Sequence, residues 1–444
     1  MKVQPHSYLM AASIFKKLPL LLLTSLFLIQ CGSTENGGST SDNGTLYTPP
    51  ENQFTVPGQI NASDLVFSVD LHRNGSPLSA PILDLNSSQQ LLLSFDLLEF
   101  DSRQLSISFT HHNPDWSRSG LAEDFYKDGY YNLMLPFGRV SRTERPDYRS
   151  YSYEFPNDNI EFLVSGNYML QVEDTDSGNL LFSLPFFITE NEGDIISQVE
   201  TITVPRDEGR ISHIPRSIFE TPDYITTPQF DVEFYYVQNQ FWGRARRADE
   251  LDTSTPGEVQ FEVSRDNSFV GDYEFQVLYL TDLTQQAPGV LEYDPSDIPP
   301  RIELFEDVQG FTANRDQIPL SSIKGFDSSL NARYANVHFK FDTNYQFGNG
   351  SEIYLVGDFT NWAIRSGYRL QYRQESDRWR TNGIIKTGTY AYKYVVIQNN
   401  EIMDLTLDDS FTQSRQEYHA LVYYRDPNRF YYRLLQTNNF FKNS

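Results

Sequence analysis

Cysteine and the common catalytic motifs are nearly absent from this sequence. Cys31 is the single cysteine in 444 residues, so no disulfide can form within the chain. There is no Gly-x-Ser-x-Gly elbow, no glycine-rich phosphate loop and no His-x-x-x-His pair, the patterns that indicate a catalytic serine, a nucleotide site and a zinc site. The sequence therefore predicts no catalytic residue, no metal, no cofactor and no small-molecule substrate. We expect the protein not to be an enzyme.

Helical patterns are missing too, whereas aromatic residues are abundant. No long run shows the 3.6-residue period of an amphipathic helix. Aromatic residues make up 14% of the chain, and they favour strands. Turn signals such as Asn74-Gly75 and Asp128-Gly129 recur, and the chain is too long for one core. The predicted fold class is all-β, with tandem immunoglobulin-like β-sandwich domains after a lipoprotein signal peptide.

Residues 1–30 are predicted to be a signal peptide. Three lysines flank or precede an apolar run at residues 20–29, which is too short to span a bilayer. The run leads into Gln30-Cys31, whose setting is similar to a bacterial lipobox; the alternative is a plain secretory peptide with a chance cysteine. A tri-acylated Cys31 would anchor the mature protein stably in a membrane. Residues 31–53, rich in Gly, Ser, Thr and Asn, would form a flexible tether.

The chain is strongly acidic. Its formal net charge is −24, and loss of the signal peptide removes three lysines and no acidic residue. Such a surface disfavours nucleic acid and anionic lipid as partners. A protein partner with a basic rim suits it better, unless the acidity serves only to maintain solubility. The one basic cluster, Phe241–Arg247, is either an exposed loop that balances its acidic surroundings or a contact for an acidic partner.

Residues 54–190 contain a dense series of strand patterns. Apolar or alternating residues predict strands at residues 91–98, 105–109, 151–155 and 180–188. The chain must turn at Asn113-Pro114-Asp115-Trp116, because proline cannot donate a backbone hydrogen bond. Alternate aspartates in Asp174–Asn179 suit either a hairpin turn or a calcium site. We prefer the turn, because the distal glutamate of a calcium loop is missing.

An ordered set of short motifs in this region resembles one known family. Asp115-Trp116 is followed by Leu-x-Glu-x-Phe-Tyr-x-x-Gly at Leu121–Gly129, by a Pro-Asn-Asp turn at Pro156 and by Ser-Gly-Asn-Tyr at Ser165. The plug protein of the bacterial type IX secretion system has similar motifs in the same order, and the chain resembles that family. It departs from the family in its charged loop Gly138–Arg145 and in carrying a second histidine after His111.

The resemblance implies a non-enzymatic, lipid-anchored outer-membrane protein that faces the periplasm. It would occlude the periplasmic mouth of the translocon barrel, so its partners would be that outer-membrane barrel and the membrane that holds its lipid anchor. Aromatic residues of irregular loops are typical of interfaces. Trp116 is equally a candidate for the core. The candidate contact residues are Asp115, Trp116, Phe125, Tyr126 and Tyr130.

Residues 191–312 are predicted to form a middle β-sandwich domain, and residues 313–444 a C-terminal early-set immunoglobulin-like domain. The latter resembles glycogen-binding modules through Gly-x-Phe-x-x-Trp at Trp362 and Gly-x-Tyr-x-Tyr-Lys at Lys393. That resemblance implies that Trp362 stacks on a glucan and Lys393 donates to it, unless Trp362 is a core or edge residue. Tyr418–Tyr424 predicts a strand where the modules have a polar loop. A glycan-binding surface lipoprotein and a secretion assembly scaffold are the alternative functions.

Overall fold

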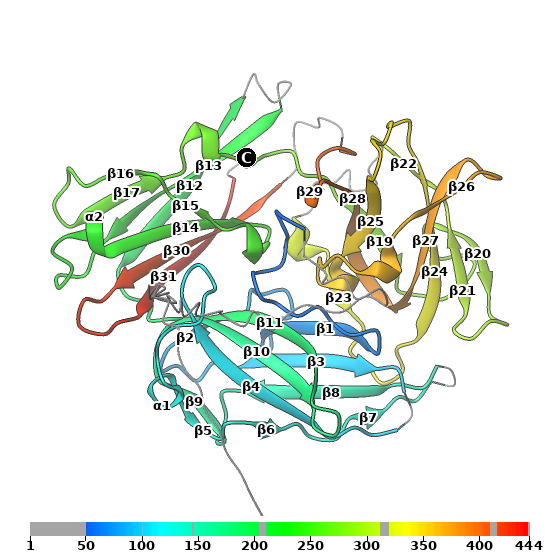
Figure 1. Cartoon of the computed structure of the whole chain (residues 1–444), viewed down its shortest axis with the longest axis horizontal. Helices are drawn as coiled ribbons and strands as arrows, with labels where there is room; N and C mark the ends of the chain where they lie inside the picture. Colours follow the sequence, from blue (N-terminus) through cyan, green and yellow to red (C-terminus); the bar gives the residue numbers. More distant parts are fainter. Residues whose placement is uncertain are drawn as a thin grey trace, which may run out of the picture. The chain divides into compact units, whose positions relative to one another are not determined.

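Strands are the main regular structure of the protein (Figure 1), which confirms the all-β prediction. The predicted signal peptide, Cys31 and most of the predicted tether lie outside the residues that the structure describes. Within the described ranges, no helix is both long and apolar enough to cross a bilayer. The computed structural model describes residues 50–99, 101–143, 146–203, 210–310, 319–408 and 415–442.

The first sandwich packs two sheets around large apolar side chains. One sheet has the order β1 (Val66–Arg73), β3 (Leu91–Leu97), β8 (Arg149–Phe155), β7 (Arg139–Val140); the other has the order β2 (Ile82–Asp84), β11 (Asn179–Thr189), β10 (Gly166–Asp174), β4 (Leu105–His112), β6 (Leu133–Met134). In β3, Leu91, Leu93 and Phe95 are buried in the core, because alternate residues of a strand face the same side. All four strands predicted in this region are present.

Short elements follow one edge of this sandwich. They include α1 (Glu123–Tyr126) and the two-stranded pair β5 (Lys127–Gly129) and β9 (Ile160–Phe162). β6 pairs with β4 of one sheet, and β7 pairs with β8 of the other. The chain from α1 to β7 therefore runs along the outer strand of both sheets. We call residues 123–140 the edge segment.

The second sandwich takes one of its sheets from two distant parts of the chain. One sheet has the order β12 (Asp194–Thr203), β13 (Ile211–Glu220), β17 (Glu258–Glu262), β16 (Glu250–Asp252), with β18 (Phe269–Val270) beside β13; the other has the order β15 (Arg246–Arg247), β14 (Val232–Gln238), β30 (Glu417–Arg425), β31 (Tyr432–Phe441). The short helix α2 (Pro228–Asp231) leads into β14. Figure 1 shows the hairpin of β30 and β31 beside β14. The strand predicted at Tyr418–Tyr424 is confirmed.

The third sandwich also combines distant segments. In one sheet, β28 (Gly388–Gln398) pairs with β19 (Gln276–Leu280), β23 (Gly325–Phe326), β25 (Glu352–Gly357) and β29 (Glu401–Met403); the other has the order β20 (Val290–Asp294), β21 (Arg301–Leu304), β24 (Tyr334–Asp342), β27 (Arg378–Lys386), β26 (Gln371–Arg373), with β22 (Asp307–Val308) beside β24. Single 3₁₀ turns lie at η2 (Trp242–Arg244), η3 (Arg265–Asn267), η4 (Leu320–Ser322), η5 (Asp358–Thr360) and η6 (Ser366–Tyr368).

The sheets do not follow the boundary predicted between residues 312 and 313, and this corrects it. β19 and β21 precede that boundary, yet they pair with β28 and β24, which follow it. β30 and β31 complete the second sandwich instead of the third. Periodicity identifies a strand from its own residues, but it carries no information about a partner that lies far away in the chain. The boundary at residues 190/191 stays a prediction.

Residues 50–63 precede β1 and bond to all three sandwiches; we call them the strap. The Glu51 amide donates to the Asn400 carbonyl (2.7 Å), next to β29 of the third sandwich. The Ser183 amide of β11 donates to the Ile60 carbonyl (3.0 Å). The predicted tether was expected to extend to residue 53, whereas the described residues from 50 onward belong to the folded body.

The strap also contacts the loop after β14. The Gly243 amide donates to the Phe54 carbonyl (3.1 Å). A Cβ atom on Gly243 would lie 1.9 Å from the Thr55 carbonyl oxygen, so only glycine allows this close approach. The Phe54 ring lies edge-on to the Phe241 ring, with 4.7 Å between ring centroids. The second sandwich is therefore packed against the strap.

Candidate functional site

The edge segment is fixed to the first sandwich by buried side chains. Tyr126 of α1 is almost fully buried, and its hydroxyl donates to the Phe109 carbonyl of β4 (3.3 Å). Leu133 and Leu135 are buried in the same core. Burial raises the pKa of Tyr126 to about 12, so the hydroxyl keeps its proton and remains a donor. These contacts give the segment a defined position on the sandwich.

A buried lysine shapes the turn after α1. The Lys127 ammonium donates to the carbonyls of Tyr130 (3.1 Å) and Tyr131 (3.3 Å), and it forms an ion pair with Glu123 (2.5 Å). Its side chain is 2% exposed. Because these bonds hold the backbone at Tyr130 and Tyr131, the two tyrosine side chains are displayed from a fixed turn.

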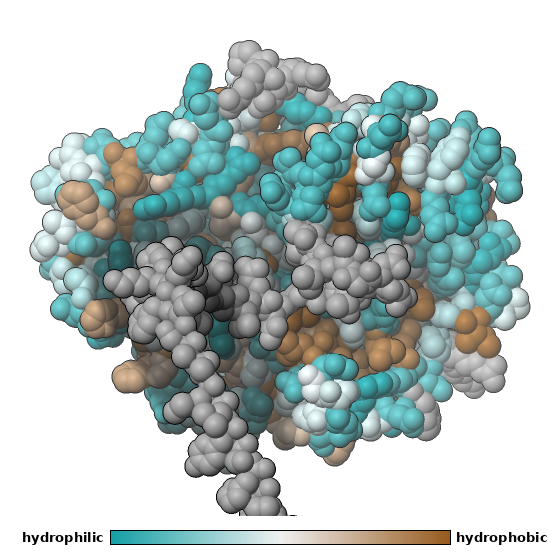
Figure 2. Space-filling model, viewed as in Figure 1, coloured by the Kyte–Doolittle hydropathy of each residue, from teal (hydrophilic) through white to brown (hydrophobic). Residues whose placement is uncertain are grey.

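Large apolar side chains of the edge segment face solvent. Phe125, Tyr130 and Phe137 are 68%, 66% and 66% exposed. Figure 2 shows hydrophobic residues at the surface in several places on one face of the molecule. Single exposed apolar residues are ordinary, but their recurrence along one short segment with a fixed backbone is typical of a protein interaction site. The other exposed large apolar residues of the segment are Tyr131, Met134 and Val140.

A buried ion pair connects the first sandwich to the third. Asp96 of β3 accepts from the Lys386 ammonium of β27 (2.7 Å) and from the Tyr334 hydroxyl of β24 (2.6 Å). The side chains of Asp96 and Lys386 are 2% and 4% exposed. The Lys386 ammonium also lies 4.9 Å from the centre of the Tyr148 ring. Burial, together with the Asp96 carboxylate, raises the pKa of Tyr334 well above its ordinary value, so its hydroxyl stays a donor.

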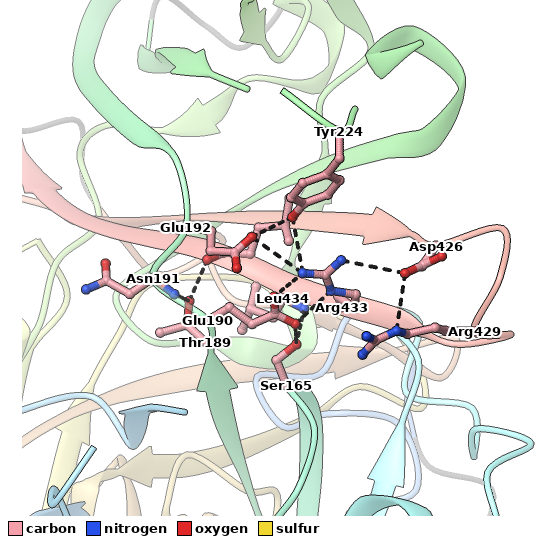
Figure 3. A network of polar contacts seen from close by, with 11 residues as sticks. Ser165, Thr189, Glu190, Asn191, Glu192, Tyr224, Asp426, Arg429, Arg433 and Leu434 are labelled. Carbon is pink, nitrogen blue, oxygen red and sulfur yellow. Dashed lines mark hydrogen bonds and ion pairs between the residues drawn. The ribbon is translucent and has the colours of Figure 1, made fainter. Parts of the chain in front are cut away.

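A second polar network connects the first sandwich to the second (Figure 3). Arg433 of β31 forms an ion pair with Glu190, in which its Nε donates to Glu190 Oε1 (2.8 Å) and its Nη2 to Glu190 Oε2. Ser165 Oγ donates to the same carboxylate (2.7 Å), and the Leu434 amide donates to Ser165 Oγ (3.1 Å). The hydrogen bonds that Arg433 donates to the Glu190 carboxylate raise the pKa of its guanidinium. Side chains of Arg433 and Glu190 are 12% and 10% exposed.

An apolar cluster lies beneath this network. Trp116, Phe187, Trp242 and Tyr423 are among its buried members. Phe187 and Trp242 come from the first and second sandwiches, and their ring centroids are 4.5 Å apart. The Tyr423 hydroxyl of β30 donates to Asn167 Oδ1 of β10 (2.6 Å). The first sandwich is therefore braced against the other two by buried polar and apolar contacts.

Comparison with models of protein families identifies the first sandwich. Residues 66–190 match the model described as Type 9 secretion system plug protein 1st domain. This part of the chain is similar to the first domain of the plug protein family. We call it the plug domain. The match confirms the resemblance found in the sequence, and it connects the chain to type IX secretion and to the cell envelope. The plug family and the all-β fold fit a structural protein better than an enzyme.

Solved structures show that the whole fold occurs elsewhere. The crystal structure of a hypothetical protein from Parabacteroides merdae is 20% identical, with a TM-score of 0.78, and the alignment covers 88% of this chain and 100% of that chain. This similarity shows a shared fold that includes the plug domain. A biofilm associated protein BSP domain, at 7% identity and a TM-score of 0.16 over 90% of this chain and 62% of its own, supports no argument. No match was found among curated proteins.

Two predicted contact residues of the plug domain lie at the turn after β4. Asp115 is exposed, and its carboxylate accepts from the Ser117 amide (3.0 Å) and hydroxyl (2.6 Å). Trp116 is 7% exposed, and its ring centroid is 5.5 Å from that of Phe187. Of the two roles considered for Trp116, the structure shows the core role. Asp115 stays a predicted contact.

The other three predicted contact residues belong to the edge segment. Phe125 and Tyr130 face solvent, whereas Tyr126 is buried and cannot meet a partner. The Tyr126 prediction is therefore corrected: its ring fills the core and leaves Phe125 outside. The sequence analysis missed Tyr131 and Phe137. The signal was present, since aromatic residues recur from Phe125 to Phe137 without a strand-like alternation.

The side chains of the two predicted glycan-binding residues form hydrogen bonds with other residues of the protein. The Trp362 indole donates to Asp358 Oδ1 (3.0 Å), and its ring lies 5.0 Å from that of Phe241 and 5.3 Å from that of Phe275. Lys393 has a side chain 3% exposed and donates to Asp408 (2.7 Å). Trp362 is thus no open stacking platform and Lys393 no accessible donor, which corrects both assignments.

The two loops that the sequence singled out, Asp174–Asn179 and Gly138–Arg145, form contacts within the protein. Asp174 ends β10, its carboxylate pairs with Arg103 (2.6 Å), and Asp176 N donates to it (3.0 Å). Asp174 and Asn179 are paired at the end of β10 and the start of β11, so this segment forms the predicted hairpin turn. Within the described part of the chain, no group of acidic, histidine or cysteine residues could hold a metal ion. In the charged loop that departs from the family, the Arg142 amide donates to the Leu330 carbonyl (2.8 Å), so this part of the loop braces the plug domain.

Proposed function

We propose that this protein is a lipid-anchored outer-membrane protein that occludes the periplasmic mouth of the type IX translocon barrel. Two findings support the proposal: the match of residues 66–190 to a plug-protein domain, and the exposed aromatic edge segment that this domain carries. A lipid on Cys31 would hold the body on the periplasmic face of the membrane. Such tethering raises the effective concentration of the plug domain near the barrel.

The edge segment is the observation that carries the proposal. Its aromatic side chains are exposed, yet the backbone that bears them is tied to a buried core by Tyr126 and Lys127. Aromatic side chains dominate interface energies once a partner buries them. Because the plug domain is braced against both other sandwiches, the segment is presented on a rigid body, as a seal over a pore requires. The acidic surface favours a barrel mouth with a basic rim.

We expect the triple change Phe125→Ser, Tyr130→Ser and Phe137→Ser to release the protein from the barrel. Binding should weaken about 100-fold or more, because central interface side chains contribute about 2 kcal/mol or more each. The melting temperature should change little, since all three side chains are exposed. Copurification from detergent-solubilised outer membrane measures the binding, and uptake of a small antibiotic measures the permeability of the outer membrane, which should rise.

A matched control uses three exposed phenylalanines outside the plug domain. Phe230, Phe305 and Phe430 are 80%, 59% and 92% exposed, and their triple replacement by serine should leave barrel recovery and permeability unchanged. Equal loss of the barrel in the control would contradict the proposal. Lost protein export without raised permeability would favour an assembly scaffold instead.

The anchor is tested by Cys31→Ser combined with the triple edge change. This variant lacks both the proposed lipid and the proposed barrel contact, so we expect it in the soluble periplasmic fraction after cell fractionation. Cys31→Ser alone should be partly retained by the barrel. Persistence of the combined variant in the membrane fraction would rule out the lipid assignment, whereas the barrel assignment would stand on the copurification result.

A further inference from the structure

The basic cluster Phe241–Arg247 contains three arginines in different environments. Arg244 forms an ion pair with Asp404 (2.5 Å) and donates to the Asn52 carbonyl of the strap (2.7 Å). Arg247 has a side chain 62% exposed and lies 3.6 Å from Glu233. Both arginines balance a neighbouring carboxylate, as one of the two interpretations of the cluster predicts. Arg246, between them, does not.

Arg246 is half-buried and has no carboxylate partner among the residues that the structure describes. Its Nη1 donates to the carbonyls of Asn267 (2.8 Å) and Ser268, and its guanidinium lies 4.4 Å from the centre of the Phe269 ring. Within the same ranges, its Nε and Nη2 have no acceptor. These two donors share one edge of the planar guanidinium, which is the geometry that binds a carboxylate through two parallel hydrogen bonds.

A pocket of about 330 Å³ is lined in part by Arg246. That volume is within the range of about 300–1,000 Å³ that small-ligand sites occupy. The pocket combines cationic and phenolic groups with apolar rings, a lining suited to an anion carried on an apolar body. Its lining includes Arg244, Arg246, Tyr273, Phe241, Phe269 and Leu405.

The charge of the pocket is uncompensated. Arg244 and Asp404 neutralise each other, so Arg246 leaves a net positive charge. Burial is the largest influence on the pKa of Arg246 and lowers it, whereas nearby groups that include the Asp404 carboxylate act in the opposite direction. A partly buried cation without a counter-charge is unfavourable, and a ligand carboxylate would remove that cost. The chain has 59 acidic and 35 basic residues, so acidic partners are plentiful. A half-buried arginine without one therefore has no evident role in stabilising the fold.

The geometry points to a carboxylate-binding site in this pocket, in which Arg246 holds the carboxylate bidentately and Phe241, Phe269 and Leu405 contact an apolar or aromatic group beside it. The carboxylate is either the C-terminus of a peptide or an acidic side chain next to an apolar residue. This site lies between β15 of the second sandwich and the segment of Asp404 and Leu405 after β29. It is apart from the edge segment and does not depend on the plug function.

The test compares acid and amide probes on the full chain in detergent. N-acetyl-phenylalanine presents a terminal carboxylate, N-acetyl-phenylalanyl-aspartyl amide presents a side-chain carboxylate, and N-acetyl-phenylalanine amide presents neither. We expect at least one acid to bind tenfold or more tightly than the amide in ligand-observed NMR titrations. The acid that binds tightly identifies the source of the carboxylate. Equal binding of the acids and the amide to the unmodified protein would overturn the proposal. So would the absence of binding of either acid at millimolar concentration.

Two variants assign the site to Arg246. Arg246→Gln should weaken binding of the acid tenfold or more and leave amide binding unchanged. Arg247→Gln, one residue along β15 and exposed, should change binding less than twofold. If both variants weaken acid binding equally, the effect is one of general charge and the proposal fails.

Discussion

Replacing Lys386 with methionine is expected to lower the free energy of unfolding by about 3–5 kcal/mol, because it leaves a buried carboxylate without its counter-charge. Among the described residues, Asp96 would keep the Tyr334 hydroxyl as its side-chain donor, in a site where its own side chain is 2% exposed. Thermal and urea denaturation of the variant measure the loss. The packing of the plug domain against the third sandwich should be weakened most, because the ion pair of Asp96 and Lys386 joins these two sandwiches.

An exposed ion pair provides the matched control for Lys386. Arg333 and Asp282 lie 3.9 Å apart with side chains 45% and 64% exposed, so Arg333→Met should cost no more than about 1 kcal/mol. The double variant Asp96→Leu with Lys386→Met should recover much of the stability, since it removes both buried charges. If Lys386→Met costs no more than Arg333→Met, the Asp96 ion pair does not hold the junction.

Replacing Arg433 with methionine is expected to cost a similar amount, about 3–5 kcal/mol. Glu190 would lose a bidentate ion pair and keep the Ser165 hydroxyl as a donor. Trp116 and Trp242 lie in the adjacent apolar cluster. Tryptophan fluorescence during urea denaturation therefore monitors this junction, and the midpoint should move to lower urea concentration.

Arg429 is the control for Arg433. It lies in the same network (Figure 3), 3.5 Å from Asp426, but its side chain is 60% exposed. Arg429→Met should therefore change the free energy of unfolding by less than about 1 kcal/mol. Equal midpoints for the two variants would mean that the ion pair of Arg433 and Glu190 does not stabilise the junction between the plug domain and the second sandwich.

The strands of the plug domain could be predicted because their residues alternate. Leu105–His112 and Asn179–Thr189 alternate or run continuously apolar, and each has its nearest partner within the same 125-residue region. The edge segment was predicted only in part. Phe125 and Tyr130 were expected at the surface and lie there, but Tyr126 is buried. Adjacent residues of a helix lie about 100° apart around its axis, so Phe125 and Tyr126 face different directions. The sequence does not state which of the two faces the core.

The two predicted glycan-binding residues show where prediction from local sequence motifs fails. Trp362 and Lys393 stand in motifs that suggest a surface site, yet Trp362 is half-buried against other rings and Lys393 is buried. What covers them includes Phe241 and Tyr273, which lie more than a hundred residues earlier in the chain. A local motif cannot reveal covering by a distant segment, and the misplaced boundary at residue 312 has the same cause.

The pairing of β14 with β30 sets the order in which the protein can assemble. Every strand of the plug domain lies between residues 66 and 189, so this domain can close as soon as that stretch of the chain is available to fold. The second sandwich begins at residue 194, but its core includes Tyr418, Val422 and Leu435. Its early strands must remain open until those residues arrive, and contacts so distant in sequence form slowly. The half-made second sandwich is therefore the stage at which this chain most needs protection from aggregation.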